Sequence, residues 1–283
     1  MAELIGLEPM LEEARRGRYA VGAFNYCNAE MGQAVIEEAV AQRSPVIMIV
    51  GPWEIPLVGV KMLAEIARWV AKDADVPVCL HLDHGDTVEL ALECIEAGFP
   101  SVMIDASQHK FEENARLTRL VVEMAHPKGI TVEGELGAVG RVGVESAEGA
   151  GEASLTDPAK AAEFVERTGV DALAVAIGNA HGIYAQMPEL DFERLEAIRD
   201  AVGVPLVLHG GSGTPPEQLH RAIDLGISKV NVASELGRAY LNTLVEAAAK
   251  NTWYAWALVD AKAAVRQVIG RWMRELGSAG RAQ

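Results

Sequence analysis

The sequence predicts an α/β protein with one domain over residues 1–283, a (β/α)8 TIM barrel with an extra C-terminal helix. Three observations predict this fold. The chain has 283 residues, an ordinary length for one such barrel. Half of the residues are hydrophobic but only 5% are aromatic, so aliphatic side chains must fill the core, as they do between parallel strands and helices. Strand-like runs alternate with helical patterns along the whole chain.

Eight short aliphatic runs are the predicted strands. Each is followed by a segment with helical periodicity, which favours a closed parallel barrel. The alternative is an open doubly wound sheet, but in that fold we would expect a G-x-G-x-x-G turn after an early strand, and the sequence lacks one there. The predicted strands are residues 19–24, 45–50, 77–82, 101–104, 130–135, 173–176, 204–208 and 228–232.

The predicted helices follow the strands in order. Asn28 is a typical N-cap for the first of them, and Gly98 is a typical stop for the third. Residues 137–154 form the longest predicted loop, and long loops in compact domains are usually functional or mobile. The predicted helices are residues 28–42, 60–72, 87–96, 111–125, 156–168, 192–201, 216–225, 234–250 and 258–276.

Composition limits the expected partners and location. Lys and Arg number 25 against 40 Asp and Glu, a net charge of −15, and such a surface repels a phosphate backbone, so no nucleic-acid partner is expected. Cys27, Cys79 and Cys94 are too few and too far apart for a disulfide framework. The N-terminal segment lacks a signal-peptide pattern and no apolar run could cross a bilayer. We therefore expect a cytoplasmic protein with no membrane partner.

Polar residues gather where the predicted strands end, and in (β/α)8 barrels the active site lies at the C-terminal ends of the strands. Packing does not explain such a concentration, so we expect these residues to surround an active site. They are His81, Asp83, His84, Asp105, Glu133, Glu135, Asn179, His181, His209, Ser212 and Asn231.

Three of the seven histidines, His84, His181 and His209, fall at or just beyond predicted strand ends. One such histidine would more often be a hydrogen-bonded loop residue, but three imidazoles with one open position are typical of catalytic zinc. His81 lies two residues before Asp83 and points the same way, so we interpret it as a residue that supports a ligand. The histidines without this context are His109, His126 and His220.

Two loops after the last two predicted strands are suited to phosphate. Gly210-Gly211-Ser212-Gly213 precedes a helix that starts after Thr214-Pro215-Pro216, so small residues and a helix dipole could meet an anion. Asn231-Val232-Ala233-Ser234 is the matching loop after the last strand. Glycine alone is weak support because tight turns also need it. Two such loops at adjacent strand ends nevertheless favour a phosphate site, as in many barrels.

Motifs at these strand ends occur in a specific order along nearly the whole chain. They include Gly22-Ala23-Phe24-Asn25, His81-Leu82-Asp83-His84, Met103-Ile104-Asp105-Ala106-Ser107, Glu133-Gly134-Glu135-Leu136-Gly137, Asn179-Ala180-His181-Gly182, His209-Gly210-Gly211-Ser212-Gly213 and Lys229-Val230-Asn231-Val232. In this order they resemble the class II ketose-bisphosphate aldolases, a family that includes fructose-bisphosphate and tagatose-bisphosphate aldolases.

The resemblance implies a metal-dependent aldolase that reversibly cleaves a ketose phosphate or bisphosphate to dihydroxyacetone phosphate and an aldehyde such as glyceraldehyde 3-phosphate. Asp83 would remove the C4 hydroxyl proton, and zinc would stabilise the resulting enediolate as a Lewis acid. Glu145 resembles the loop glutamate that protonates this intermediate, whereas Glu148 and Glu152 are interpreted as solvating charges.

The resemblance also implies ligands and partners. The zinc ligands would be His84, His181 and His209, with Asp105 and Glu135 at an alternative metal position. The substrate and its phosphate would be bound by Asn25, Gly182, Gly210, Gly211, Ser212, Asn231 and Ser234. A monovalent cation near the phosphate is implied as well, and so is a homodimer or homotetramer that uses the C-terminal helices.

The sequence departs from the family pattern in the half of the site that meets the aldehyde. A Ser-Glu-Gly-like segment is replaced by Gly51-Pro52-Trp53-Glu54, and the connection 251–256 lacks an Asp-Pro-Arg-Lys-like motif. Bulkier Tyr26-Cys27 follows Asn25, and Gln108-His109 follows Ser107. These changes favour an acceptor other than glyceraldehyde 3-phosphate, although drift in an ordinary aldolase is the alternative.

Two other functions remain open. A metal-dependent hydrolase could use three histidines and carboxylates on a barrel rim, but such sites usually carry an H-x-H pair on an early strand, which is missing here. A phosphosugar-binding barrel without activity would be expected to lack Asp83 or a zinc ligand, and none is lost.

Overall fold

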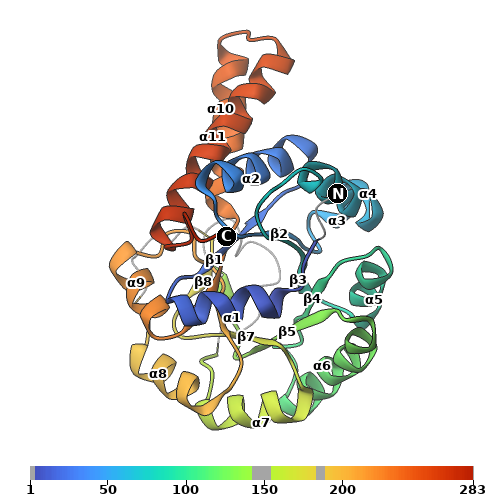
Figure 1. The fold of residues 1–283 in the computed structure, drawn as a ribbon, viewed down its shortest axis with the longest axis vertical. Helices are drawn as coiled ribbons and strands as arrows, with labels where there is room; N and C mark the ends of the chain where they lie inside the picture. Colours follow the sequence, from blue (N-terminus) through green and yellow to red (C-terminus); the bar gives the residue numbers. More distant parts are fainter. Residues whose placement is uncertain (1–3, 142–153, 183–188, 283) are drawn as a thin grey trace.

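The computed structural model describes residues 4–141, 154–182 and 189–282, and its main strands close into a parallel barrel (Figure 1). This confirms the predicted fold class. Around the barrel the strands lie in the order β1-β10-β9-β7-β5-β4-β3-β2. The strands of the barrel are β1 (Val21–Asn25), β2 (Val46–Val50), β3 (Val78–Gly85), β4 (Ser101–Ile104), β5 (Thr131–Leu136), β7 (Ala172–Val175), β9 (Leu206–Leu208) and β10 (Ile227–Val232). Two further short strands, β6 (Gly140–Arg141) and β8 (Ala180–His181), pair with each other above the barrel ends and were not predicted.

Helices follow the strands and cover the outside of the barrel. Asn28 caps the first of the predicted helices, because its side chain accepts a hydrogen bond from the Met31 N–H at 2.9 Å. The helices are α1 (Leu7–Gly17), α2 (Ala29–Gln42), α3 (Ile55–Val58), α4 (Val60–Ala71), α5 (Val88–Glu96), α6 (Phe111–Ala125), the 3-10 turn η1 (His126–Lys128), α7 (Pro158–Thr168), α8 (Phe192–Ala201), α9 (Pro216–Asp224), α10 (Ser234–Ala249) and α11 (Tyr254–Glu275).

The core has two compartments, because both faces of each strand are buried. In β2 every residue is buried. Met48 and Val50 join the cluster between the strands and the helices, whereas Ile47 and Ile49 join the cluster inside the barrel. The alternation of side chains along a strand therefore sends aliphatic residues into both compartments.

Helix α1, which the sequence patterns did not predict, closes the N-terminal end of the barrel (Figure 1). Leu7 and Leu11 are fully buried and pack into the cluster inside the barrel. The Leu7 N–H donates to Oγ1 of Thr131 at the start of β5 over 2.9 Å. With this end closed by α1, the C-terminal end is the one left for a site.

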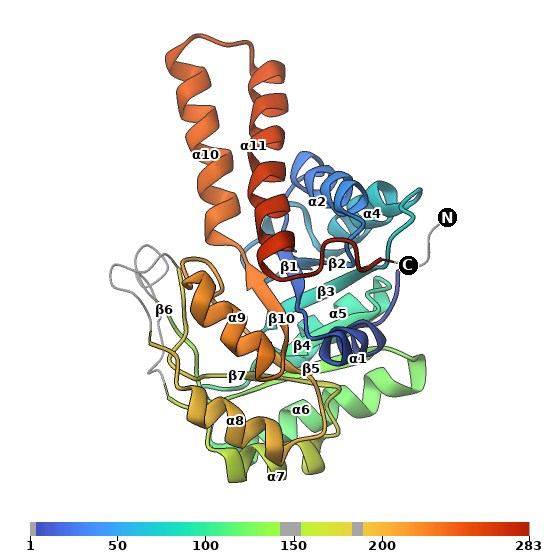
Figure 2. The same ribbon diagram turned by 60° about the vertical axis from the view of Figure 1, so that its left-hand side comes forward.

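Helices α10 and α11 pair as a hairpin that projects beyond the barrel (Figure 2). Helix α11 begins at Tyr254 and not at Leu258, so the predicted start of the last helix was wrong. The Ala257 N–H bonds to the carbonyl of Trp253, which extends the first turn. Among the described residues, no helix has the combination of length and apolar character needed to span a membrane.

Candidate active site

Three histidines meet at the C-terminal end of the barrel. His84 lies at the end of β3, His181 in β8, and His209 directly after β9. The three side chains offer ligand atoms that all lie within 4.8 Å of one another. The ring centroid of His84 is 4.7 Å from that of His181 and 4.4 Å from that of His209. Three imidazoles at this spacing fit a zinc ion with one open position.

The end of β3 is irregular, and this lets two consecutive side chains serve one site. In a regular strand, Asp83 and His84 would point to opposite faces. The pairing of β3 with β4 shifts register between Leu82 and Gly85, and His84 adopts a φ of 48°. Gly85 must lack a side chain, because a Cβ there would lie 2.5 Å from the Met103 carbonyl oxygen.

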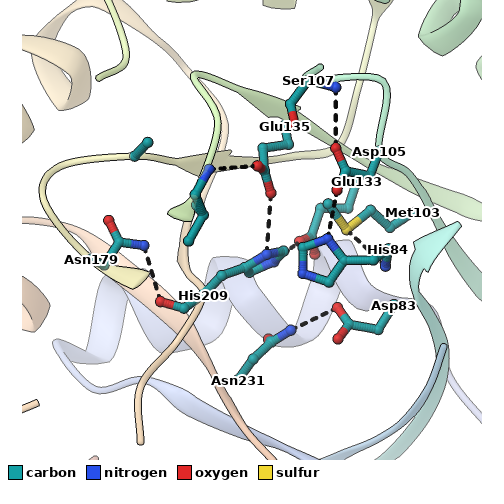
Figure 3. Close-up of polar contacts among 12 residues, drawn as sticks. Asp83, His84, Met103, Asp105, Ser107, Glu133, Glu135, Asn179, His209 and Asn231 are labelled. Carbon is teal, nitrogen blue, oxygen red and sulfur yellow. Dashed lines mark hydrogen bonds and ion pairs between the residues drawn. The ribbon is translucent and has the colours of Figure 1, made fainter. Parts of the chain in front are cut away.

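Carboxylates set the orientation of two of the imidazoles (Figure 3). Asp105 Oδ2 lies 2.7 Å from Nδ1 of His84, so Nδ1 carries the donated hydrogen and Nε2 stays available. That Nε2 is buried without a hydrogen-bond partner among the described residues. Glu133 Oε1 lies 2.9 Å from Nε2 of His209, which leaves Nδ1 available in the same way. Each ring thus has one anchored and one available nitrogen.

Glu135 approaches the available nitrogen of His209. Its Oε2 lies 3.3 Å from Nδ1. Burial by itself lowers the pKa of His209, but the hydrogen bond to Glu133 and the nearby carboxylate of Glu135 outweigh it and raise the pKa to about 10. The two buried carboxylates therefore favour the protonated form of His209.

A second group of metal-type ligands overlaps the first. His84, Asp105 and Glu135 also offer ligand atoms within 4.8 Å of one another. Burial alone raises the pKa of Asp105, but its hydrogen bond with His84 dominates and holds the pKa well below the ordinary value. The structure thus brings together the two residues that the resemblance places at an alternative metal position.

Asp83 is buried beside the histidines and is held by Asn231. Its Oδ1 accepts a hydrogen bond from Nδ2 of Asn231 over 2.7 Å. Burial raises the pKa of Asp83, but the nearby His84 and His209 outweigh this and keep the pKa below its ordinary value. The carboxylate is therefore ionised at neutral pH and can act as a base.

The loop after β9 needs glycine to fit between its neighbours. Gly210 has a φ of 65°, and a Cβ there would lie 2.0 Å from the Ala180 carbonyl oxygen. A Cβ on Gly211 would lie 2.4 Å from the Val230 side chain. The Gly211 N–H bonds to the Asn231 carbonyl over 3.0 Å. These contacts hold the loop after β9 against β8 and β10.

Buried polar atoms of these loops lack partners among the described residues. They are Ser212 Oγ, Thr214 Oγ1 and Asn231 Oδ1. Buried polar groups are normally hydrogen-bonded, so these atoms indicate that something binds next to them. Ser212 and Thr214 precede α9, and the dipole of a helix N-terminus favours an anion.

The other predicted site residues are only partly placed at the site by the described structure. Asn25 ends β1, and its Oδ1 is buried without a partner in the described part of the chain. Gly182 is buried with a φ of 101° directly after β8, and Ser234 is the first residue of α10. Glu145 lies outside the described residues, as do Glu148 and Glu152.

The rim formed by the ends of β1, β2 and β3 carries some of the residues that depart from the family pattern. The connection 251–256 instead joins α10 to α11 at the far end of the hairpin, away from the barrel (Figure 2), so the expectation that it belongs to this half of the site was wrong. Glu54 accepts a hydrogen bond from the Gly51 N–H over 2.8 Å. Burial raises the pKa of Glu54, and the charge of Asp83 adds to that rise. The ring of Trp53 stands 6.4 Å from that of His84. A carboxylate and an indole therefore border the metal-type cluster on this side.

The sequence patterns left two buried charged residues without a role. Lys229 donates to Oε2 of Glu133 over 2.8 Å, and both side chains are fully buried. Glu133 is one of the polar residues predicted at strand ends. Lys229 lies inside a strand, where residue spacing gives no indication that a lysine is part of the site.

Asn179 belongs to a motif that the sequence analysis placed at the site. Its Nδ2 donates a hydrogen bond to the His209 carbonyl over 3.0 Å.

Comparisons with known proteins agree with this geometry. A family model described as "Fructose-bisphosphate aldolase class-II" matches residues 6–281. The fructose-bisphosphate aldolase of Geobacillus stearothermophilus is 44% identical over 286 residues, covering 99% of each chain. The crystal structure of the YdjI aldolase from Escherichia coli K12 superposes with a TM-score of 0.90 at 38% identity, covering 99% of this chain and 100% of that one. The fructose-bisphosphate aldolase of Campylobacter jejuni, with a TM-score of 0.84 at 23% identity over 98% of this chain and 97% of that one, supports the fold.

These matches give no support to a metal-dependent hydrolase. The family model covers nearly the whole chain, and the histidine cluster fits the zinc dependence of this family. The chain therefore belongs to the class II fructose-bisphosphate aldolase family and is a class II aldolase, an aldehyde-lyase.

Proposed function

We propose that one catalytic domain, residues 1–283, reversibly cleaves a ketose bisphosphate to dihydroxyacetone phosphate and an aldehyde such as glyceraldehyde 3-phosphate. The observation that carries this proposal is the meeting of Asp83 with His84, His181 and His209 at the open end of the barrel. An aldol cleavage of this type needs a base for a hydroxyl and a cation for a carbonyl. Asp83 is proposed as the base, and the three histidines are proposed to hold Zn²⁺.

Asp83 takes the proton from the C4 hydroxyl of the ketose. The C4–O bond then becomes a carbonyl, the C3–C4 bond breaks, and its electron pair moves onto the dihydroxyacetone phosphate half as an enediolate. Zinc held by His84, His181 and His209 would supply Lewis-acid stabilisation of that negative charge. Asn231 keeps the base oriented through its 2.7 Å hydrogen bond. Glu145 is proposed to return a proton to C3, which completes the product.

The loops after β8, β9 and β10 are proposed to hold the phosphate. Gly182, Gly210 and Gly211 keep side chains away, while Ser212 offers a buried hydroxyl and Ser234 stands at the start of α10. Asn231 and Asn25 are proposed to contact the substrate. The buried oxygens Ser212 Oγ and Asn231 Oδ1 support a monovalent cation beside the phosphate.

A second candidate differs in the aldehyde that the enzyme accepts. The Gly51 N–H, directly after β2, donates a hydrogen bond to the carboxylate of Glu54. This donor is therefore occupied by an anionic side chain of the protein itself. Glu54 and Asp83 also interact electrostatically. A substrate phosphate next to these two carboxylates would be repelled. This observation favours an aldehyde whose tail is neutral, or carries its charge away from Glu54.

We also propose a homodimer or homotetramer that assembles through the hairpin of α10 and α11. Its exposed apolar side chains form the kind of surface that marks interaction sites. Leu241, Val245, Trp253, Tyr254 and Trp256 are each at least 61% exposed. Sedimentation analysis of the protein tests this.

The three free cysteines and a phosphorylated metabolite as substrate support a cytoplasmic location.

The deciding experiment offers purified protein a panel of ketose 1,6-bisphosphates and ketose 1-phosphates with and without EDTA. Release of dihydroxyacetone phosphate is followed through a coupled reductase. Chelator-sensitive release from fructose or tagatose 1,6-bisphosphate supports the first candidate. Release only from a ketose 1-phosphate supports the second. No release from any compound by zinc-loaded protein would contradict both.

A further inference from the structure

A fully buried ion pair lies inside the barrel beside the histidine cluster. Lys229 of β10 donates to Oε2 of Glu133 of β5 over 2.8 Å, and neither side chain is exposed. Removing two charges from water is expensive, and well-packed hydrophobic residues often stabilise such a position equally well. Stability alone therefore does not explain why the pair is present. Its contacts with neighbouring residues indicate what else it does.

The second oxygen of Glu133 contacts a residue of the active site (Figure 3). Oε1 lies 2.9 Å from Nε2 of His209. An ionised carboxylate only accepts hydrogen bonds, so Nε2 is the donor and Nδ1 is left toward His84 and Glu135. If the ring turned over, Oε1 of the buried carboxylate would lose its hydrogen-bond donor.

His81 lies on another side of Glu133 without a hydrogen bond to it. Nε2 of His81 lies 3.5 Å from Oε2 of Glu133, and Nδ1 of His81 lies 2.8 Å from the Ser101 hydroxyl. All four of these buried groups come from different strands, β3, β4, β5 and β10. Lys229 and His209 therefore make the hydrogen bonds to this carboxylate, and the His81–Ser101 pair lies beside it.

We propose that Glu133, anchored by Lys229, is the positioning residue that holds the His209 ring with Nδ1 directed into the metal site. The inference rests on the proposed role of His209 as a zinc ligand. Histidines that bind metal generally donate their other ring N–H to a carboxylate or carbonyl, and removing that partner lowers metal affinity. Glu133 supplies this partner, and Lys229 supplies the counter-charge that a buried carboxylate requires.

Two double variants separate positioning from packing, because each removes the ion pair without leaving a lone buried charge. Glu133→Gln with Lys229→Met keeps an oxygen that can accept from His209. Glu133→Leu with Lys229→Met removes that acceptor at a similar side-chain volume. Ser101→Ala is the control, since it removes a hydrogen bond of the same buried network but contacts neither Glu133 nor His209.

The readouts are the zinc dissociation constant, from competition with a chelating dye, and the visible absorption spectrum of the Co²⁺-loaded protein. Thermal unfolding shows that each variant is folded. We expect the Leu variant to bind zinc about 10–100-fold more weakly and to give an altered Co²⁺ spectrum. The Gln variant and Ser101→Ala should keep the affinity and spectrum of the unaltered protein.

Three results would overturn the proposal. One is a Leu variant that binds zinc as tightly as the unaltered protein. Another is an equal loss of affinity in the Gln and Leu variants, and a third is a comparable loss in Ser101→Ala, because then the network acts only through packing. If the Leu variant does not fold, the Gln variant decides, since a tenfold loss despite the retained acceptor contradicts positioning.

Failure of the proposed function gives a different pattern. If His209 is not a zinc ligand, His209→Ala binds zinc as tightly as the unaltered protein. If His209 is a ligand but Glu133 does not position it, His209→Ala loses affinity while the Leu variant does not.

Discussion

Asn231 donates a hydrogen bond from Nδ2 to Oδ1 of Asp83 over 2.7 Å, joining residues 148 positions apart in the sequence. This bond links the end of β10, beside the proposed phosphate site, to the proposed base. It also fixes one carboxylate oxygen, so the carboxylate has a defined orientation toward the histidine cluster. Burial raises the pKa of Asp83, but the surrounding imidazoles and Lys229 keep it below the ordinary value, so the base is ready at neutral pH.

Replacing the proposed base should abolish most of the activity without loss of metal. Asp83→Asn keeps an oxygen for Asn231 but cannot accept the hydroxyl proton, and such a change typically lowers kcat by about 10²–10⁴-fold. Steady-state assays of dihydroxyacetone phosphate release, with zinc content measured on the same sample, test this. A variant with nearly unchanged kcat and full zinc would rule out Asp83 as the base.

Metal removal should inactivate and destabilise the protein. The three histidines proposed as ligands come together only in the folded state, so zinc at 100 times its dissociation constant should add about 2.7 kcal/mol of stability. Dialysis against EDTA should lower both activity and Tm, and added zinc should restore both. His181→Ala should abolish this rise in Tm. Full activity in protein shown to hold no divalent ion would contradict the metal assignment.

Gly211→Ala should weaken phosphate binding. The new Cβ would lie 2.4 Å from the Val230 side chain and 2.9 Å from the Asn231 carbonyl oxygen, so the loop must move. Overpacking of this kind destabilises by about 1–3 kcal/mol, and the displaced loop should raise KM for the phosphorylated substrate. Gly237→Ala is the matched control, because nothing lies within 4 Å of its Cβ. Equal KM values for the two variants would argue against this loop as the phosphate site.

The thiols should react slowly near pH 8. Burial raises the pKa of Cys94 to about 12 and raises the pKa of Cys79 well above its ordinary value. For Cys27, burial also raises the pKa, with Glu54 and Glu30 adding to the shift. A raised pKa lowers the fraction of reactive thiolate at a given pH, so reaction should quicken as the pH rises. A chromogenic disulfide reagent should detect three thiols promptly only after unfolding. Rapid reaction of the native protein at pH 8 would contradict this.

Helix α1 should matter for stability but not for chemistry. Leu11 is fully buried at the closed end of the barrel, remote from the histidines. Leu11→Ala should lower the free energy of unfolding by about 2–5 kcal/mol, because it leaves a cavity. The kcat of the folded variant should stay unchanged, and denaturant unfolding together with steady-state kinetics measures both effects. A large fall in kcat at a temperature where the variant is folded would show coupling between the two ends of the barrel.

Much of the site could be predicted because its residues occupy regular places in the sequence. His84, His181 and His209 stand at or just beyond the ends of β-rich runs, and parallel strands in a barrel end on the same side. The predicted order of strands and helices was confirmed for the same reason, since periodicity is a local property. Helix α1 was not predicted because it precedes the first strand. The alternation of strands and helices predicts a helix only after a strand.

The sequence by itself determined the barrel, the identity of the clustered side chains and the glycine loops, because these depend on local periodicity and on position relative to strand ends. Only the tertiary structure decided which nitrogen of His209 is available and why Lys229 is buried. Those answers depend on contacts of Glu133 with residues 76 and 96 positions away. Contacts at such separations arise from the closure of the barrel, and no local pattern in the chain specifies them.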